Sequence, residues 1–390
     1  MNIFLCVIIL ILILFLLYIF KNKYLIITFI CSLIILNFVF NPSICINGSI
    51  SGATLFFNKV FPALFPFLII CNMMLYFNGV YIYSKIFGKT LCRPLGIPIE
   101  CSFVIIISML CGYPLGAKYS CDLYENKIID YNTCERLLNI ASSASPLFII
   151  ATIGTSMFQS TLIGYIILIS NYLSCFFISL ILPNRKHKFS IVCSAKNIIP
   201  EKINFGTALK NSIENSINTC LSVGGFITLF SVINNIIKNS ILFNTILDKI
   251  CVIFKIPKAS VEGTFLGLVE MTNGCNIISS SNISIDIKII VISFLLSFSG
   301  LCIIWQCSSF INKHNFSLFR YIKFKFIQGL ICSFISYILY KVLFNKITTT
   351  TISYSMISNN ININILFLIL WLVLLIPIIL YNIFLSIHFS

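Results

Sequence analysis

Residues 101–118 read CSFVIIISMLCGYPLGAK, and this stretch decides which kind of fold the chain can adopt. Its apolar part, Cys101–Leu110, would rise only about 15 Å as a helix, which is half of a bilayer's hydrocarbon core. The run ends in Gly112, Pro114 and Gly116, and proline and glycine interrupt helices. A short apolar run with this ending predicts a re-entrant hairpin or a broken membrane helix.

The rest of the chain has the composition of a membrane protein. Of its 390 residues, 58% are hydrophobic and 9% are charged, and the mean hydropathy is +1.02. A soluble domain carries about 25% charged residues, so this chain could not cover a water-facing surface. At roughly 20 residues per crossing, about eight to ten membrane segments would fit. We therefore predict an all-α polytopic membrane protein.

The charge pattern indicates topology and does not indicate nucleic-acid binding. The formal net charge is +15, from 26 Lys and Arg against 11 Asp and Glu. These cations stand in short clusters between apolar runs, as the positive-inside rule produces. We expect no nucleic-acid partner.

Cysteine and histidine give no metal signal. None of the 17 cysteines forms a C-x-x-C pair, and most stand inside apolar runs, where a free cysteine behaves as a small hydrophobic residue. The three histidines are isolated near expected span ends. We predict no disulfide framework, no metal site and no cofactor.

The pattern of apolar runs and polar breaks predicts the organisation of the chain. Asn41–Ser51 is expected to be a polar turn, Ala117–Ile140 an exposed or interfacial amphipathic helix, and Lys313–Lys325 a cationic connection. Single spans are expected at Ile3–Phe20 and Ile361–Ile387. The expected units are an N-terminal helical hairpin at 1–50, a first membrane repeat at 51–183, a basic connection at 184–205, a second repeat at 206–345, and a polar loop with a C-terminal transmembrane helix at 346–390.

The two halves align at an offset of 154 residues. Ser143–Ile150 (SASPLFII) falls on Ser297–Ile304 (SFSGLCII), with five of eight positions identical, and with one extra residue Gly112 falls on Gly267. Paired broken segments in two halves point to the binding site of a transporter. The sequence therefore predicts two internal repeats with re-entrant or broken helices, plus extra N- and C-terminal spans.

Charge does not decide how the repeats are oriented. With 101–116 re-entrant, the first repeat crosses the membrane three times, and an odd number makes the second copy inverted. That assignment leaves Lys238, Lys249, Lys255 and Lys258 on the outer side, against the positive-inside rule. Inverted and parallel repeats both stay open.

Four motifs follow one another in order, namely FPALFPF (Phe61–Phe67), CGYPLGAK (Cys111–Lys118), ERLL (Glu135–Leu138) and SASPLF (Ser143–Phe148). Together with EMTNG (Glu270–Gly274), they resemble the YlbJ (SpoVV) family of sporulation integral membrane proteins, which contain nucleoside-recognition or Gate domains.

The resemblance covers about Ser51 to Phe344 and implies a function. It implies a protein of endospore formers, made in the mother cell and placed in the membrane around the forespore. There it would move dipicolinic acid toward the forespore. Its expected partners are membrane lipids, a small organic anion as substrate, and further copies of itself or other sporulation membrane proteins.

Dipicolinate is a flat aromatic ring bearing two carboxylates, so its carrier should offer half-helix N-termini, hydroxyls or a cation. The candidate substrate-binding residues are Ser142, Ser143, Ser145, Lys118, Tyr113, Glu270, Asn273, Ser297 and Ser299. The candidate hinge residues are Gly112, Pro114, Gly116, Pro146, Gly267, Gly274 and Gly300.

Each of these assignments has a structural alternative. The serines and glycines could mark close helix packing instead, and Lys118 could extend to the membrane interface. Tyr113 could stack on the ring or anchor the interface. Glu270 could couple protons, because acids inside membrane segments are functional by default, or it could lie at the membrane edge. Asn273 could hydrogen-bond the substrate.

No enzyme motif is present: HExxH, a P-loop Gly-Lys-Ser/Thr and GxSxG are all missing from the sequence. The leading hypothesis is a dipicolinate transporter of sporulation. The alternatives are a carrier for nucleosides or another small organic anion, and a non-transporting membrane scaffold for spore maturation.

Overall fold

The computed structural model describes residues 23–182, 204–254 and 256–347, and this part of the chain folds into fifteen α-helices. The α-helices are α2 (Lys23–Phe40), α3 (Pro42–Leu55), α4 (Phe61–Tyr76), α5 (Gly79–Leu95), α6 (Ser102–Cys111), α7 (Leu115–Glu125), α8 (Tyr131–Ile140), α9 (Thr161–Ile181), α10 (Phe205–Lys238), α11 (Ile241–Phe254), α12 (Lys258–Val269), α13 (Met271–Ser280), α14 (Ile285–Phe298), α15 (Gly300–Ile311) and α16 (Leu318–Ile347). Two π-helical segments, η1 (Phe56–Val60) and η3 (Phe148–Met157), and two 3₁₀ turns, η2 (Ile99–Cys101) and η5 (Asn312–His314), join them.

Four helical segments of the described residues are long and apolar enough to cross a membrane. They are α9, α10, the stretch Ile285–His314 and α16, and two bent pairs would raise the number to six. The pairs are α2 with α3, bent by 107°, and α4 with α5, bent by 94°. The all-helical membrane fold is thus confirmed. The spans expected at Ile3–Phe20 and Ile361–Ile387, and nearly all of the basic connection, lie outside the described residues.

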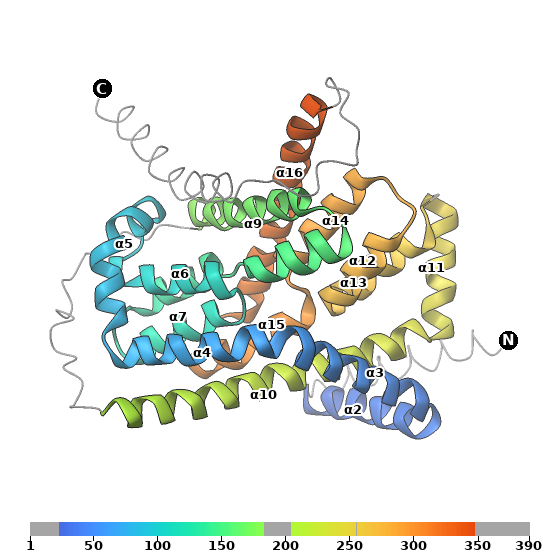
Figure 1. Cartoon of the computed structure of the whole chain (residues 1–390). Coiled ribbons are helices and arrows are strands. Elements are labelled where there is room, and N and C mark those ends of the chain that lie inside the picture. The colour runs from blue at the N-terminus through green and yellow to red at the C-terminus, as the bar shows by residue number, and fades with distance from the viewer. Residues whose placement is uncertain (1–22, 183–203, 255, 348–390) are drawn as a thin grey trace.

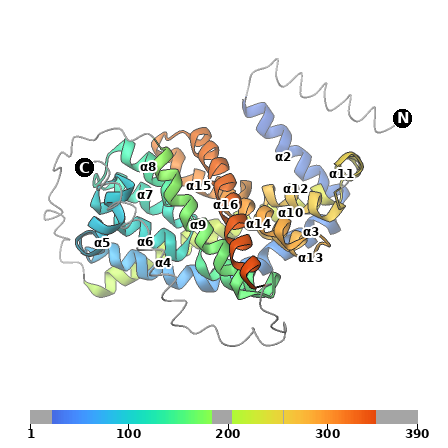
Figure 2. The ribbon, with the colours of Figure 1, turned by 90° about the horizontal axis from the view of Figure 1, so that it is seen from above.

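Two long helices organise the structure (Figure 1). The 34-residue α10 runs along α3 and α4, and α16 packs against α9 and α14. The α6–α7 pair and the α12–α13 pair lie on opposite sides of the molecule, which the view from above also shows (Figure 2). The buried core is formed mainly by α6, α7, α8, α9, α14 and α15, and α4 and α10 cover one side of it.

The segment expected to be a polar turn at Asn41–Ser51 is helical in the structure. Pro42 occupies the first turn of α3, where its missing N–H costs no hydrogen bond. Gly48 and Gly52 then let α3 approach α10, since a Cβ on either would come within 2.9 or 2.7 Å of a Cα atom of α10. Small residues four apart are a means of close helix packing in membranes, and here they explain the weak apolar signal of the segment.

The expected short helix before the GYP turn is confirmed as α6, which has ten residues. The expectation of one exposed helix over Ala117–Ile140 is wrong, because the segment forms two helices, α7 and α8, separated by a turn, and more than half of the residues of each are buried. An amphipathic pattern does not distinguish a helix on the interface from one that packs its apolar face on protein. The contact of α7 with α8 and α15 accounts for the burial.

The second half contains two breaks near the expected positions. α14 ends at Phe298, Ser299 adopts a left-handed conformation (φ 76°), and α15 begins at Gly300. α12 and α13 are separated by the extended residue Glu270. The expected cationic connection at 313–325 is shorter than predicted, because α16 begins at Leu318 and takes three of the four cations into the helix.

Candidate functional site

A cavity of about 540 Å³ lies between the start of α7, the break after α8 and the start of α13. Its polar wall includes Tyr113, Ser145, Glu270, Thr272 and Gln306, and most of the other lining residues are aromatic or aliphatic. We call it the central cavity. Three of the nine candidate binding residues line it, namely Tyr113, Ser145 and Glu270.

Tyr113 joins the two halves of the chain at this cavity. The turn that carries it requires Gly112, whose φ of +80° is adopted readily only by glycine. The Tyr113 N–H donates to the Ser143 carbonyl at 2.9 Å. Its hydroxyl lies within hydrogen-bond distance of Met271 Sδ (2.9 Å) and of the Leu296 carbonyl oxygen (3.2 Å). The α6–α7 turn is therefore hydrogen-bonded to the non-helical residues 141–145 after α8, which we call the first break, and to the start of α13.

Each serine of the first break hydrogen-bonds to a different neighbour. Ser142 Oγ pairs with the Tyr321 hydroxyl at 2.9 Å, and Ser143 Oγ donates to the Ser108 carbonyl at 2.8 Å. Ser145 Oγ accepts from the Phe148 N–H at 3.3 Å, so it caps the start of η3. The predicted half-helix cap is thus present at Ser145, while Ser142 and Ser143 are buried away from the cavity.

One side chain bridges the two breaks. Asn171 of α9 accepts from the Ala144 N–H at 3.2 Å and donates to Ser297 Oγ at 2.9 Å. Ser297 and Ser299 are both fully buried, and Ser299 Oγ points to the Ser297 carbonyl at 3.4 Å. Asn171 therefore holds the first break next to Ser297–Gly300, the break between α14 and α15, which we call the second break. The serines of the second break do not line the central cavity.

Glu270 is buried and caps α13. Its two carboxylate oxygens accept the N–H groups of Thr272 at 3.0 Å and Asn273 at 2.9 Å. With 4% of its surface exposed, it is not at an accessible edge of the protein. Such a cap suits a carboxylate, since it offsets the positive end of the helix dipole. The Asn273 N–H is already engaged, and the Asn273 side chain does not line the cavity.

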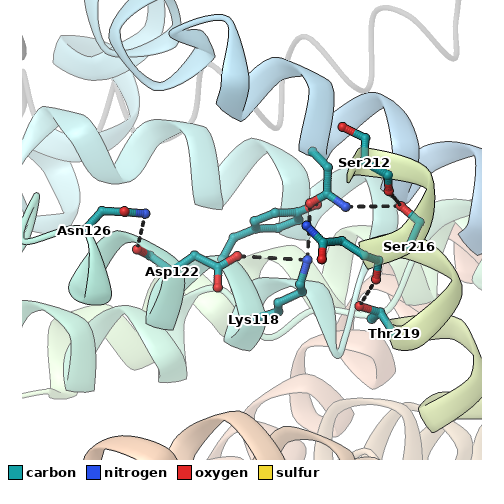
Figure 3. A network of polar contacts seen from close by, with 9 residues as sticks. Lys118, Asp122, Asn126, Ser212, Ser216 and Thr219 are labelled. Carbon is teal, nitrogen blue, oxygen red and sulfur yellow. Dashed lines mark hydrogen bonds and ion pairs between the residues drawn. The ribbon is translucent and has the colours of Figure 1, made fainter. Parts of the chain in front are cut away.

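Lys118 lines a second cavity, of about 830 Å³, which residues of α4, α5, α7 and α10 enclose. We call it the outer cavity. Its Nζ donates to Asn72 Oδ1 at 3.2 Å and lies 4.0 Å from Asp122. Asn72 also accepts from the Tyr119 hydroxyl and donates to Ser216 Oγ of α10. Figure 3 shows Lys118 on α7 reaching toward the turn of α10 that carries Ser212 and Ser216. The structure therefore separates Lys118 from the other candidate residues.

The candidate hinge residues fall into two groups. Gly112, Pro114, Pro146 and Gly300 stand at breaks or first turns of helices. Gly116, Gly267 and Gly274 are helical residues at close contacts: a Cβ on Gly116 would be 1.8 Å from the Ala141 carbonyl oxygen, and one on Gly274 would be 2.2 Å from Gly267 Cα. Their role as hinges stays a prediction.

Sequence reasoning missed three polar residues of these networks. Asn72 and Asn171 stand inside apolar runs, where a single amide gives little signal, and Lys325 was expected in a cationic connection. All three are buried in the structure. In the described residues, the cysteines are free and no group of three or more Cys, His, Asp or Glu side chains could hold a metal ion.

Comparisons with known proteins give one relative with a described role. No protein-family model and no solved structure matches the chain. The chain is 25% identical over 325 residues to the sporulation integral membrane protein YlbJ of Bacillus subtilis (strain 168), covering 78% of this chain and 79% of the relative. The aligned share excludes a match through one shared span alone. The chain is therefore a distant homologue of this sporulation integral membrane protein over most of the length of both chains.

Proposed function

We propose that this protein is a secondary transporter or facilitator that carries dipicolinate from the mother cell toward the forespore. The observation that carries the proposal is the central cavity, because it lies where interrupted segments of both halves of the chain meet. Interrupted helices at corresponding positions are typical of transporter binding sites. A scaffold has no need of them.

The order of elements supports an internal repeat. The elements α6, α7, α8, η3 and α9 begin 152 to 157 residues before α12, α13, α14, α15 and α16, respectively. Each set therefore consists of two short helices joined by a turn, then a helix that ends in a break, and then a long apolar helix. A repeat of this kind would build a site from two related halves, and the central cavity has walls from both.

The chemistry of the central cavity fits a flat aromatic dianion. A volume of about 540 Å³ is within the range of small-molecule sites, roughly 300–1,000 Å³. The rings of Tyr113 and Phe148 offer surfaces for an aromatic ring. The hydroxyls of Ser145 and Thr272 and the amide of Gln306 offer donors to carboxylates.

The helix α7 connects the two cavities and suggests a route. Tyr113, just before α7, lines the central cavity, and Lys118 in its first turns lines the outer cavity. Lys118 would attract the anion in the outer cavity, and Tyr113 would separate the two compartments. Movement of the α6–α7 turn would then open one cavity to the other.

The decisive experiment is to delete the gene in its own spore former and to measure dipicolinate in the mother cell and forespore separately. Transport predicts accumulation in the mother cell and depletion in the forespore. Normal forespore dipicolinate would overturn the proposal. Uptake of labelled dipicolinate by proteoliposomes, with nucleosides as competitors, separates the alternatives. Competition by nucleosides favours a nucleoside carrier, and no uptake of either compound favours a scaffold.

A further inference from the structure

Lys325 of α16 is a buried lysine at the first break. Its exposed fraction is 0%, whereas Lys323, two residues earlier on the same helix, is exposed. Lys325 Nζ donates to the Ser142 carbonyl oxygen at 2.9 Å and to Gln328 Oε1 at 3.1 Å. A side chain in this position does not extend its ammonium group to the membrane interface, and it does not mark the cytosolic side of the membrane as an exposed lysine would.

No carboxylate accompanies this lysine. In the described part of the chain, the carboxylates paired with α16 are Glu135, bound to Arg320, and Asp286, bound to Lys341, near the two ends of the helix. Lys118, by contrast, has Asp122 at 4.0 Å. Buried charges in proteins are paired or they become neutral. Lys325 has two oxygen acceptors, which a neutral amine can satisfy with its two hydrogens.

Lys325 is coupled to the central cavity through two neighbours. Its Nζ lies 5.7 Å from the centroid of the Tyr113 ring, and Tyr113 lines the cavity. The Ser142 carbonyl that it contacts begins the segment whose residues Ala144 and Ser145 form the cavity wall. A charge on Nζ would therefore act on the cavity through one ring and one short segment, and it would act more strongly at a buried position than in bulk water.

The titratable groups around Lys325 are thiols and phenols, and none of them is basic. The thiols of Cys175 (α9), Cys307 (α15) and Cys332 (α16) interact electrostatically with Lys325. The Tyr113 ring lies beside its Nζ, and Tyr321 contacts the same residue, Ser142, through its hydroxyl. Beyond Tyr113, Glu270 carries the nearest acid of the cavity wall, and its oxygens are engaged by two backbone N–H groups of α13. An anion in the cavity would thus meet no other basic side chain among its lining residues in the described chain.

We propose that Lys325 is a proton-binding site linked to anion binding in the central cavity, so that a dicarboxylate enters together with one proton. The empty site holds the neutral amine. When the dianion enters, the amine takes one proton from the solution and becomes an ammonium, and the net charge brought into the site changes from −2 to −1. When the anion leaves, the proton is released. The inference rests on the proposed function in taking dipicolinate as the anion.

The test measures dipicolinate binding and proton uptake together, with the purified full-length protein in a weakly buffered solution containing a pH indicator. The wild type should take up about one proton for each dipicolinate bound. Lys325→Met, which keeps the size of the side chain, should take up none and should bind about tenfold more weakly. Lys325→Arg stays charged and should bind without proton uptake. Lys323→Met, an exposed change on the same helix, should match the wild type.

A second readout does not need dipicolinate. Because the unfolded chain would hold one proton more than the folded chain at Lys325, the melting temperature of the wild type should rise more steeply with pH than that of Lys325→Met, up to about pH 10.4, where an unfolded lysine loses its proton. Equal slopes, or unchanged proton uptake in Lys325→Met, overturn the proposal. Unequal slopes without dipicolinate binding support the proton site and overturn dipicolinate as the ligand.

Discussion

The central cavity is lined by the turn just before α7 and the outer cavity by α7 itself, and the two cavities differ in their charged residues. Among the described residues that line the central cavity, Glu270 is the one charged side chain, and backbone N–H groups engage both of its oxygens. The outer cavity is lined by charges of both signs, among them Glu100, Lys118, Asp122 and Lys313. Under the proposed function, the outer cavity would attract ions, and the central cavity would select its ligand by shape and by neutral donors beside Lys325.

The largest effect on stability and uptake should come from displacing α7, which lies between the two cavities. Gly116→Ala places a Cβ against the Ala141 carbonyl and must displace α7. We expect a loss of about 2–3 kcal/mol in unfolding free energy and damage to both cavities, measured as a lower melting temperature and lost uptake. Gly225→Ala in α10 is the control, because its Cβ would meet nothing within 4 Å. Equal behaviour of the two variants would refute the close contact.

Asn72→Leu should disturb the outer cavity alone. It removes the partner shared by Lys118, Tyr119 and Ser216, and the groups left unsatisfied should cost about 1–3 kcal/mol. Dipicolinate uptake should slow mainly at low substrate concentration, with the maximal rate kept. Asn218→Leu, an exposed change on the same cavity wall, is the control. A fall in the maximal rate instead would place Asn72 in the central mechanism.

Glu270 distinguishes a cap from a proton carrier in the central cavity. Glu270→Ala removes both acceptors of the α13 N-terminus and should cost about 1 kcal/mol. Glu270→Gln keeps one amide oxygen as an acceptor and should be milder in both thermal unfolding and uptake. If both variants abolish uptake equally while remaining folded, Glu270 acts through its proton and the cap is secondary.

Ser145→Ala should give the smallest effect. It removes one hydroxyl of the central cavity and the 3.3 Å bond to the Phe148 N–H. A loss of roughly 1 kcal/mol corresponds to about fivefold weaker dipicolinate binding, with little change in melting temperature. Ser280→Ala, an exposed serine at the end of α13, is the control. Unchanged binding would remove Ser145 from the substrate site.

Local interruptions were the most predictable part of the fold. Gly112 and Pro114 end α6 as the sequence indicated, and Ser297–Gly300 contains the break between α14 and α15. Such signals depend on the backbone of a few neighbouring residues, so they can be seen without the rest of the molecule. Ser145 as a cap is of the same kind.

The failures share a different cause. The small residues of Pro42–Leu55 indicate a turn in the sequence, whereas in the structure they belong to a helix and allow it to approach α10, which is distant in sequence. The charges at 117–140 indicate an exposed or interfacial helix, but several of them contact protein: Lys118 and Asp122 line the outer cavity, and Glu135 pairs with Arg320 of α16. Lys325 was grouped with its exposed neighbours because the direction of a helical side chain depends on what packs on each face.

The sequence alone shows that this is a membrane protein and where its helices are interrupted, because the lengths of apolar runs and the positions of glycine and proline act locally. Which polar groups contact one another became visible in the tertiary structure alone. It brought Tyr113 to Met271, joined both breaks through Asn171, assigned Lys118 to a separate cavity and buried Lys325 beside the first break. These pairings depend on long-range packing of α9, α10 and α16, which no local pattern encodes.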